Sequence, residues 1–224
     1  KWKKDSGDQI LNQLKKLGCS CDWSRNRFTM DKDLSNAVIK TFVNLYNKKI
    51  IYKDTKLVNW DTKLETAISD LEVEQKEVQS NLYYIKYKIV DDNNFLTIAT
   101  TRPETMLGDT AVAVNPKDIR YKKFVGKKIK IPISNRIVKI IADSYVSIEQ
   151  GSGALKVTPA HDFNDFEIGK RHKLEFINIF KKDGKLNNNV PKEFIDSDRF
   201  EARIKIVKLL KERNLLEKIE NIKN

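Results

Sequence analysis

We expect an α+β fold in which a closed antiparallel β-barrel of about six strands is decorated by helices. Apolar residues recur at helical spacing over the first 50 residues and again near the end of the chain. From residue 82 the pattern changes to short alternating or continuously apolar runs. The turn-forming residues between these runs leave too little chain for intervening helices. Short antiparallel strands with both faces partly apolar favour a closed barrel, because closure removes exposed strand edges.

Two helices are predicted near the start of the chain. In the first, apolar residues share one face from Ile10 to Leu17, and Gly18 follows as a residue that can take the left-handed conformation that ends a helix. The second helix is expected from Asp31 to residues 48–49, with an acidic start and a basic end that suit the helix dipole.

The core is predicted to consist of short strands, with one helix among them and one after them. The helix within the core is expected over residues 164–173, and the later helix starts at Asp198, which forms a capping-box pattern with Glu201. Residues 91–94 and 134–135 are turn formers between strands. The predicted strands are residues 82–90, 95–101, 111–114, 128–133, 136–142, 154–157 and 176–179.

Composition limits the class of protein. The chain has 224 residues and a formal net charge of +12, which favours a polyanionic partner because basic side chains displace counterions from phosphates. Most of the cations are lysines, however, and biased codon usage could produce the same excess. No apolar run reaches the ~18 residues that a membrane span needs, and no secretory signal follows the first residues, so we expect a soluble, cytoplasmic protein. Cys19 and Cys21 are too close for a mutual disulfide and are expected to be reduced.

Common catalytic constellations are not expected. The chain has two histidines, His161 and His172, and both fall in one predicted helical region, so a nucleophile–histidine triad is not indicated. Neither His-Glu-x-x-His nor paired-cysteine spacing is present, and we expect no metal. The Gly-Ser-Gly at residues 151–153 lacks the lysine of a phosphate-binding loop.

In two segments, residues 98–109 and 151–166, polar side chains are concentrated where a predicted strand ends in a turn. Loops next to strands often contain binding and catalytic residues. Capping alone could explain part of this pattern, since Thr101 with Glu104 fits a capping box and Asp162 with Asp165 fits an N-cap with an acidic first turn. On spacing alone capping is the favoured interpretation. It leaves four polar groups unexplained, Arg102, Lys156, Thr158 and the second carboxylate, and these suggest a ligand.

Both segments closely resemble the editing domain inserted in the catalytic fold of valyl-tRNA synthetases, a class I family. The resemblance extends to residues 17–25, to a junction at 57–60 and 69–74, and to Asp-Arg-Phe-Glu-Ala-Arg at 198–203. The His-x-Gly-His and Lys-Met-Ser-Lys-Ser motifs of the adenylate-forming site are absent from the sequence. The resemblance implies an editing part whose ATP binding and amino-acid activation belong to the complete synthetase. We therefore expect a helical lead-in and junction (1–75), an editing β-barrel domain (76–190) and a C-terminal exit helix packed on it (191–224).

The resemblance implies hydrolysis of threonyl-tRNA(Val), with water attacking the aminoacyl ester. Lys156, Thr158 and Asp162 would surround the threonine hydroxyl, and Asp165 would hold the α-ammonium. In the related isoleucine enzymes the positions matching Lys156 and Asp162 are typically His and Gly, so this sequence resembles the valine type. The further substrate-binding residues implied are Thr100, Thr101, Arg102, Thr105 and His161, which would line the pocket wall and contact the terminal adenosine.

The sequence departs from the family pattern at three places. Gln150 stands where many members have an aromatic residue thought to contact the adenosine, and Phe163 replaces a common proline. Residues 61–64, Asp-Thr-Lys-Leu, replace a Cys-Pro-x-Cys zinc knuckle, so no zinc is expected. The implied partners are the 3′ end of tRNA(Val) carrying threonine and the remainder of the synthetase chain. We expect a monomer without membrane contact and without a cofactor, and the alternative is a non-catalytic tRNA-binding insert.

Overall fold

The computed structural model describes residues 2–90 and 92–223. Asp91, which belongs to the predicted 91–94 turn, lies outside the described residues, as do the first and last positions of the chain. The chain divides into two compact units at Thr55 and Lys56, and each unit is described by itself. None of the helices in the described part of the chain is long and apolar enough to cross a membrane.

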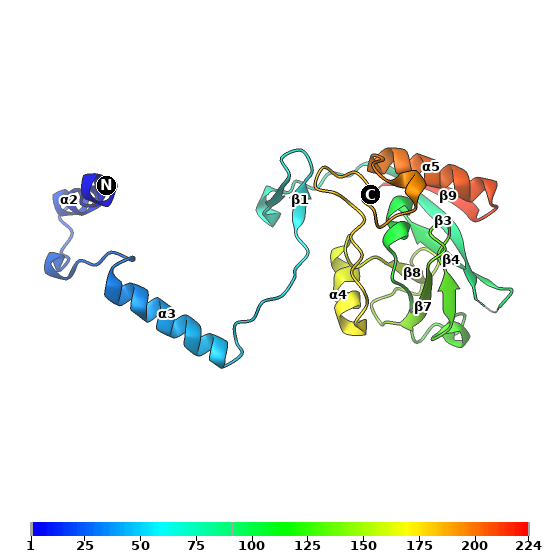
Figure 1. Ribbon diagram of the computed structural model, residues 1–224, viewed down its shortest axis with the longest axis horizontal. Helices are drawn as coiled ribbons and strands as arrows, with labels where there is room; N and C mark the ends of the chain where they lie inside the picture. Colours follow the sequence, from blue (N-terminus) through cyan, green and yellow to red (C-terminus); the bar gives the residue numbers. More distant parts are fainter. Residues whose placement is uncertain (1, 91, 224) are drawn as a thin grey trace. The chain divides into compact units, whose positions relative to one another are not determined.

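The first unit is helical, and none of the side chains described in it is buried. Helices α1 (Trp2–Ser6), α2 (Gln9–Lys16) and α3 (Lys32–Asn47) are joined by turns that include the 3-10 helix η1 (Trp23–Arg25) (Figure 1). The two predicted helices are confirmed as α2 and α3, and neither contains a buried residue. Gly18 follows α2 with a φ of 76°, the left-handed conformation expected from the sequence. Both cysteines are free.

The second unit contains the predicted barrel, together with the two-stranded hairpin of β1 (Asn59–Asp61) and β2 (Thr66–Ile68). Short 3-10 helices connect several strands. The elements after the hairpin are η2 (Asp70–Glu72), β3 (Gln79–Ile89), β4 (Phe95–Thr100), η3 (Pro103–Gly108), β5 (Ala111–Val114), η4 (Lys122–Phe124), β6 (Lys128–Lys130), β7 (Ile137–Ala142), β8 (Ala154–Val157), α4 (Phe163–His172), η5 (Lys192–Phe194), α5 (Arg199–Glu212) and β9 (Leu216–Lys223).

The main sheet runs in the order β4-β3-β6-β7-β5-β8, and β9 pairs with β3. The two ends of this path, β4 and β8, approach each other with Cα atoms within 8 Å, so the sheet is a nearly closed barrel. The predicted fold class is confirmed with one correction: β5 and β7 are parallel, whereas the other pairs are antiparallel. Two strands joined by a short connection run antiparallel, because a parallel pair needs a longer crossover. Strands β5 and β7 are not consecutive: β6 lies between them in the sequence and runs antiparallel to β7, so β5 and β7 can run in the same direction.

Two local predictions differ from the structure. Residues 176–179 do not form a strand, because the Ile179 N–H donates to the His161 side chain (3.0 Å) and not to a neighbouring strand. After α5 ends at Glu212, the chain forms β9, where a helix was expected to continue. Its apolar residues at 216, 219 and 222 are three apart, which resembles a helical pattern, and pairing with β3 decides the strand.

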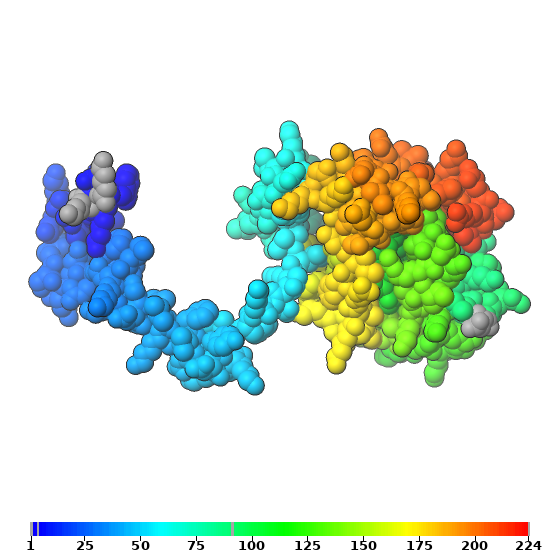
Figure 2. Space-filling model, in the orientation of Figure 1, coloured from blue at the N-terminus to red at the C-terminus, as the bar shows by residue number. Residues whose placement is uncertain are grey.

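The barrel interior is the core of the second unit. The inward-facing side chains of β3 and β4 include Ile85, Tyr87, Leu96 and Ile98, none of which is more than 1% exposed. Helix α5 covers one side of this core with its buried Ala202, Ile206 and Leu210. In Figure 2 the orange and red residues of α5 and β9 form one side of this unit's surface. These contacts give the barrel the rigidity that a site at its open seam requires.

Ile129 of β6 tests the barrel core, since its side chain is fully buried. Ile129→Ala should lower the free energy of unfolding by about 2 to 5 kcal/mol, because it leaves a cavity in close-packed surroundings. Ile119→Ala, at a side chain 87% exposed, is the matched control and should change it by less than about 0.5 kcal/mol. Urea denaturation of the full chain measures both, and equal losses would contradict this core assignment.

Candidate active site

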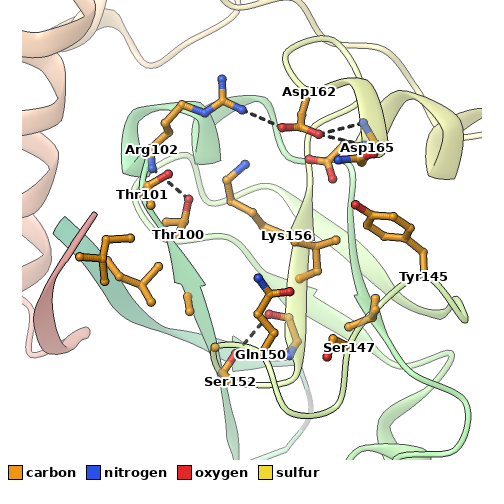
Figure 3. A pocket seen from close by; sticks show the side chains of 18 residues that line it. Thr100, Thr101, Arg102, Tyr145, Ser147, Gln150, Ser152, Lys156, Asp162 and Asp165 are labelled. Carbon is orange, nitrogen blue, oxygen red and sulfur yellow. Dashed lines mark hydrogen bonds and ion pairs between the residues drawn. The ribbon is translucent and has the colours of Figure 1, made fainter. Parts of the chain in front are cut away.

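A cavity of about 540 Å³ opens between β4 and β8, the two strands at the barrel's seam (Figure 3). Six of the nine predicted site residues line it, and Thr105, Thr158 and His161 do not. The lining residues come from β3, β4, the loop before β8, β8, the start of α4 and β9. They are Leu82, Ala99, Thr100, Thr101, Arg102, Tyr145, Val146, Ser147, Gln150, Gly151, Ser152, Ala154, Leu155, Lys156, Asp162, Asn164, Asp165 and Ile222.

The wall at the end of β4 is shaped by threonine hydroxyls. Thr100 Oγ1 accepts a hydrogen bond from the Arg102 N–H (3.1 Å), and the Thr105 hydroxyl donates to the Arg102 carbonyl (2.9 Å). These bonds turn the chain sharply after the strand. Thr105 is therefore buried behind the wall, where it supports Arg102.

The predicted capping box of Thr101 and Glu104 is wrong. The 3-10 helix η3 starts after Arg102, without a side-chain cap, and Glu104 forms a bidentate ion pair with Arg203 of α5 (2.6 and 2.8 Å). Glu104 is only 2% exposed. This buried pair fixes the cavity wall to α5, and a bidentate arginine–carboxylate pair has a defined geometry.

The opposite wall is the start of α4, where the predicted cap is confirmed. Asp162 Oδ1 accepts hydrogen bonds from the Asn164 N–H (2.9 Å) and the Asp165 N–H (3.3 Å). Its other oxygen is 3.0 Å from Arg102 Nη2, so the two walls are joined by an ion pair at the half-exposed mouth of the cavity (Figure 3). Asp162 thus combines capping with a charged contact across the cavity.

Asp165 is the buried carboxylate of the cavity. Its Oδ2 accepts a hydrogen bond from the Thr158 N–H (2.8 Å). Burial raises the pKa of Asp165 to about 6, with smaller contributions from the Asp162 and Asp109 charges, while Lys156 and the Thr158 N–H oppose the rise. A carboxylate held in this way gains from a cation that enters the cavity, since the nearby cations Arg102 and Lys156 are already paired with other carboxylates.

The cavity floor is a buried polar network that sequence reasoning missed in part. Lys156 Nζ is 3.2 Å from Asp109 Oδ1 and also donates to the Thr158 hydroxyl, which in turn donates to Asp109 Oδ1 (2.7 Å). The Tyr87 hydroxyl donates to the other oxygen of Asp109 (2.9 Å). Asp109 was not among the predicted site residues, although it ends the first polar segment directly before the buried strand β5, a place where a charge is unusual.

His161 supports the site from behind. Its Nε2 accepts the Ile179 N–H (3.0 Å), and its ring meets the Phe180 ring edge-on at 4.8 Å between centroids. Burial, together with the Lys156 and Arg102 charges, lowers the pKa of His161 to about 4. The imidazole is therefore neutral at pH 7 and holds the 177–180 segment against the turn before α4.

The loop before β8 forms the third side of the cavity with Tyr145, Ser147 and Gln150. It is anchored by Asp143, which accepts hydrogen bonds from Arg171 (3.0 Å) and lies 2.9 Å from His172 Nε2. The cavity lining also includes the apolar side chains of Leu82, Ala99 and Ile222. The cavity thus has a charged end and an apolar side.

The arrangement suits binding and positioning of a polar ligand. Within residues 2–90 and 92–223, no group of three His, Cys, Asp or Glu side chains could hold a metal ion. Of the two histidines, neither lines the cavity, so a nucleophile–histidine pair is not assembled there. The charged groups that do line it could fix an ammonium, a hydroxyl and an attacking water in one place.

The sequence is similar to a known family over nearly its full length. It matches the family described as tRNA synthetases class I (I, L, M and V) over residues 1–218. It is 65% identical over 223 residues to valine--tRNA ligase of Pelagibacter ubique, covering 100% of this chain and 26% of that protein. It is 55% identical over 219 residues to valine--tRNA ligase of Syntrophotalea carbinolica, covering 98% of this chain and 24% of that protein. The chain spans about a quarter of the length of these relatives.

Solved structures share the fold. The crystal structure of GlLeuRS-CP1 matches with a TM-score of 0.50 and 12% sequence identity, over 62% of this chain and 98% of that one. The ternary complex of Agrobacterium radiobacter K84 agnB2 LeuRS-tRNA-LeuAMS matches with a TM-score of 0.50 and 16% identity, over 98% of this chain and 36% of that one.

Asp165→Asn should raise the melting temperature at pH 8. A carboxyl whose pKa is raised to about 6 in the folded chain stabilises the folded state while it is protonated, and this contribution is lost as pH rises through about 6. Asparagine cannot ionise, so it avoids this loss and still accepts the Thr158 N–H. We expect a rise of roughly 2 °C or more at pH 8 that disappears near pH 4.

Asp118→Asn is the matched control for this measurement. The pKa of buried Asp118 is lowered, mainly by hydrogen bonds from Arg120, so the same substitution should lower the melting temperature at pH 8. Thermal melts of both variants between pH 4 and pH 8 give the comparison. A lower melting temperature for Asp165→Asn at pH 8 would show that burial does not destabilise the ionised Asp165 carboxylate.

Proposed function

Because the chain belongs to the class I tRNA synthetases of the isoleucine, leucine, methionine and valine group, we propose that its cavity hydrolyses threonyl-tRNA(Val). The family predicted from the two polar segments is confirmed, and the relatives are valine--tRNA ligases. The observation that carries the proposal is the buried polar floor of Lys156, Thr158 and Asp109 beside the Asp165 carboxylate. Such a cavity suits a small amino acid with a hydroxyl and an ammonium.

A valyl-tRNA synthetase needs a second site because threonine and valine have nearly the same shape. Valyl-tRNA synthetase is itself a known example of this limit, since a hydrophobic pocket rejects the added hydroxyl only ~10²-fold. A clearing site must therefore require the hydroxyl. It can do so by presenting a buried hydrogen-bonding group that valine would leave unpaired, at a cost of roughly 1 to 3 kcal/mol.

We assign the α-ammonium of the aminoacyl group to Asp165. This carboxylate is buried in the cavity and has a raised pKa, so an entering cation lowers the free energy of its charged form. A charge-assisted hydrogen bond of this kind is among the stronger contacts in proteins. Asp162 and Arg102, paired at the mouth, would lie beside the ligand where it enters.

We assign the side-chain hydroxyl of the ligand to Lys156, with Thr158 and Asp162 beside it. Lys156 lines the cavity, whereas the Thr158 hydroxyl is buried beneath it and acts through Lys156. Thr105 and His161 hold the walls, so we propose supporting roles for them. Thr100 and Thr101 form the wall that faces the acyl group.

The proposed reaction is hydrolysis of the ester between threonine and the terminal ribose. Water attacks the ester carbonyl carbon, the bond from that carbon to the ribose oxygen breaks, and the departing ribose oxygen takes up a proton given up by the attacking water. The products are threonine and tRNA. Because an ester is already activated, positioning of the water and stabilisation of the oxyanion by nearby donors supply the catalysis.

The tRNA end would enter at the mouth of the cavity. Arg102 is half-exposed there and can contact ribose or phosphate, and the apolar side chains of Leu82, Ala99 and Ile222 could pack against a base. We propose that residues 1–75 and 191–224 connect the site to the remainder of a longer cytoplasmic, monomeric synthetase, which would bind ATP and activate the amino acid.

A non-catalytic tRNA-binding role is the alternative, and one observation favours it. On the outside of the barrel, exposed Lys88 lies opposite Lys130, and exposed Lys128 lies opposite Lys139, across the strand ladder. Like charges placed directly opposite are destabilising, and a bound polyanion would relieve the repulsion. This role does not require Asp165.

Deacylation by the full chain tests the proposed function. Threonyl-tRNA(Val) should be hydrolysed at least about tenfold faster than valyl-tRNA(Val), because the buried donor is left unpaired by valine. Release of radiolabelled amino acid from each ester measures the two rates. Equal rates for both esters would contradict the assignment.

The pH dependence tests the role of Asp165. The kcat/KM for threonyl-tRNA(Val) should fall as pH falls through about 6, because the protonated carboxyl no longer binds the ammonium. A profile that is flat between pH 5 and pH 7.5 would exclude this role.

Asp165→Ala separates the catalytic role from the binding role. It should lower deacylation about 10- to 150-fold, the range for loss of a hydrogen bond to a charged group, and leave tRNA affinity within about twofold. Filter binding and deacylation are measured on the same preparation, with Asp118→Asn as the control outside the cavity. Unchanged deacylation with unchanged binding would support the non-catalytic alternative.

A further inference from the structure

Asp109 is buried beneath the cavity floor, with 0% of its surface exposed, and cannot touch a ligand. We propose that Asp109 is a positioning residue for specificity: it orients the floor's hydrogen bonds so that the cavity presents a fixed N–H donor of Lys156, which selects side chains bearing an acceptor hydroxyl. This inference rests on the proposed function and names what makes the site require a hydroxyl.

Three donors converge on the Asp109 carboxylate. The Tyr87 hydroxyl donates to Oδ2 (2.9 Å), and the Thr158 hydroxyl donates to Oδ1 (2.7 Å). The Lys156 ammonium is 3.2 Å from Oδ1. A carboxylate only accepts hydrogen bonds, so the polarity of every bond around it is fixed.

That polarity determines what Lys156 offers to the cavity. The Thr158 hydroxyl has one proton, which it gives to Asp109, so its oxygen accepts from Lys156. An ammonium has three N–H groups, and Asp109 and Thr158 engage two of them. Among the contacts that the described residues make with Lys156, the third N–H is not used and is available to the cavity, which Lys156 lines between the Thr100–Arg102 wall and the Asp162–Asp165 wall (Figure 3).

A fixed N–H donor distinguishes a hydroxyl from a methyl group. The threonine hydroxyl accepts the bond, whereas a valine methyl leaves a buried ammonium N–H without an acceptor, which is costly. Because two bonds hold the Lys156 ammonium in place, the position of the hydroxyl on the ligand side chain also matters. Allo-threonine, which exchanges the positions of the hydroxyl and the methyl, would point its methyl at the donor.

The burial of Asp109 also explains why neither Lys156 nor Thr158 alone would provide a fixed donor for the ligand hydroxyl. A lysine ammonium buried in the floor without Asp109 would lack its paired carboxylate, and a flexible one could turn away to water. With Asp109 present, the ammonium is neutralised and anchored from below. The specificity of the cavity thus depends on a residue that is outside it.

The test compares two esters in three variants of the full chain. In Asp109→Asn the amide donates as well as accepts, so the ratio of threonyl- to valyl-tRNA(Val) deacylation should fall at least tenfold. Tyr87→Phe removes a donor from Asp109 Oδ2 and leaves the bonds to Lys156 and Thr158, so it should keep the ratio within threefold even where its rate and melting temperature fall. Asp165→Asn removes the ammonium contact shared by both esters and should lower both rates with a smaller change in the ratio.

The outcomes are distinct. If the wild type hydrolyses the threonyl and valyl esters at equal rates, or hydrolyses neither, the proposed function fails. If the wild type is selective and folded Asp109→Asn keeps its ratio, the inference about Asp109 fails while the function stands. A ratio that falls equally in Tyr87→Phe would mean that general loosening of the core is responsible, and this too would overturn the inference.

A wild-type measurement makes the test independent of variant folding. The allo-threonyl ester should be hydrolysed at least tenfold more slowly than the threonyl ester, since its hydroxyl faces away from the anchored donor. Equal rates for these two stereoisomers would show that the donor is not fixed and would overturn the inference.

Discussion

The buried ion pair between Lys156 and Asp109 is the interaction on which the candidate site depends. Both groups are almost completely removed from water, which would be strongly unfavourable for either charge alone. The Tyr87 and Thr158 hydroxyls complete the hydrogen bonding of the carboxylate, and this satisfies the condition for a buried pair to persist. A charged polar floor can therefore exist at the edge of an otherwise apolar barrel.

The seam of the barrel gives this floor an opening. Strands β4 and β8 approach at the ends of the sheet, and the residues that follow each strand form the two walls of the cavity. Each wall is tied to a helix: Glu104 pairs with Arg203 of α5, and Asp162 caps α4. A third contact, Asp143 with Arg171, holds the loop that carries Tyr145. The site is thus supported by contacts between residues far apart in the sequence, which suits a pocket that must keep its shape.

Local patterns predicted those features whose cause is local. Strands β5 and β8 have the predicted bounds because both are short, apolar and flanked by turn formers, and Asp162 caps α4 as its spacing indicated. Predictions failed where a distant partner intervened. The Ile179 N–H is taken by His161, Glu104 is taken by Arg203, and the residues of β9 pair with β3 although their apolar spacing is helical. Local spacing carries no information about such partners.

Residue patterns along the chain were enough to predict the α+β class, most helices and strands, the family, and the two polar segments that contain six cavity-lining residues. Only the tertiary structure decided that β5 and β7 are parallel, that Thr105, Thr158 and His161 lie behind the cavity, and that Asp109 organises its floor. The physical reason is that burial, the raised pKa of Asp165 and hydrogen-bond direction depend on which groups meet in space. Asp109 and Lys156 are 47 positions apart and meet because β5 pairs with β8.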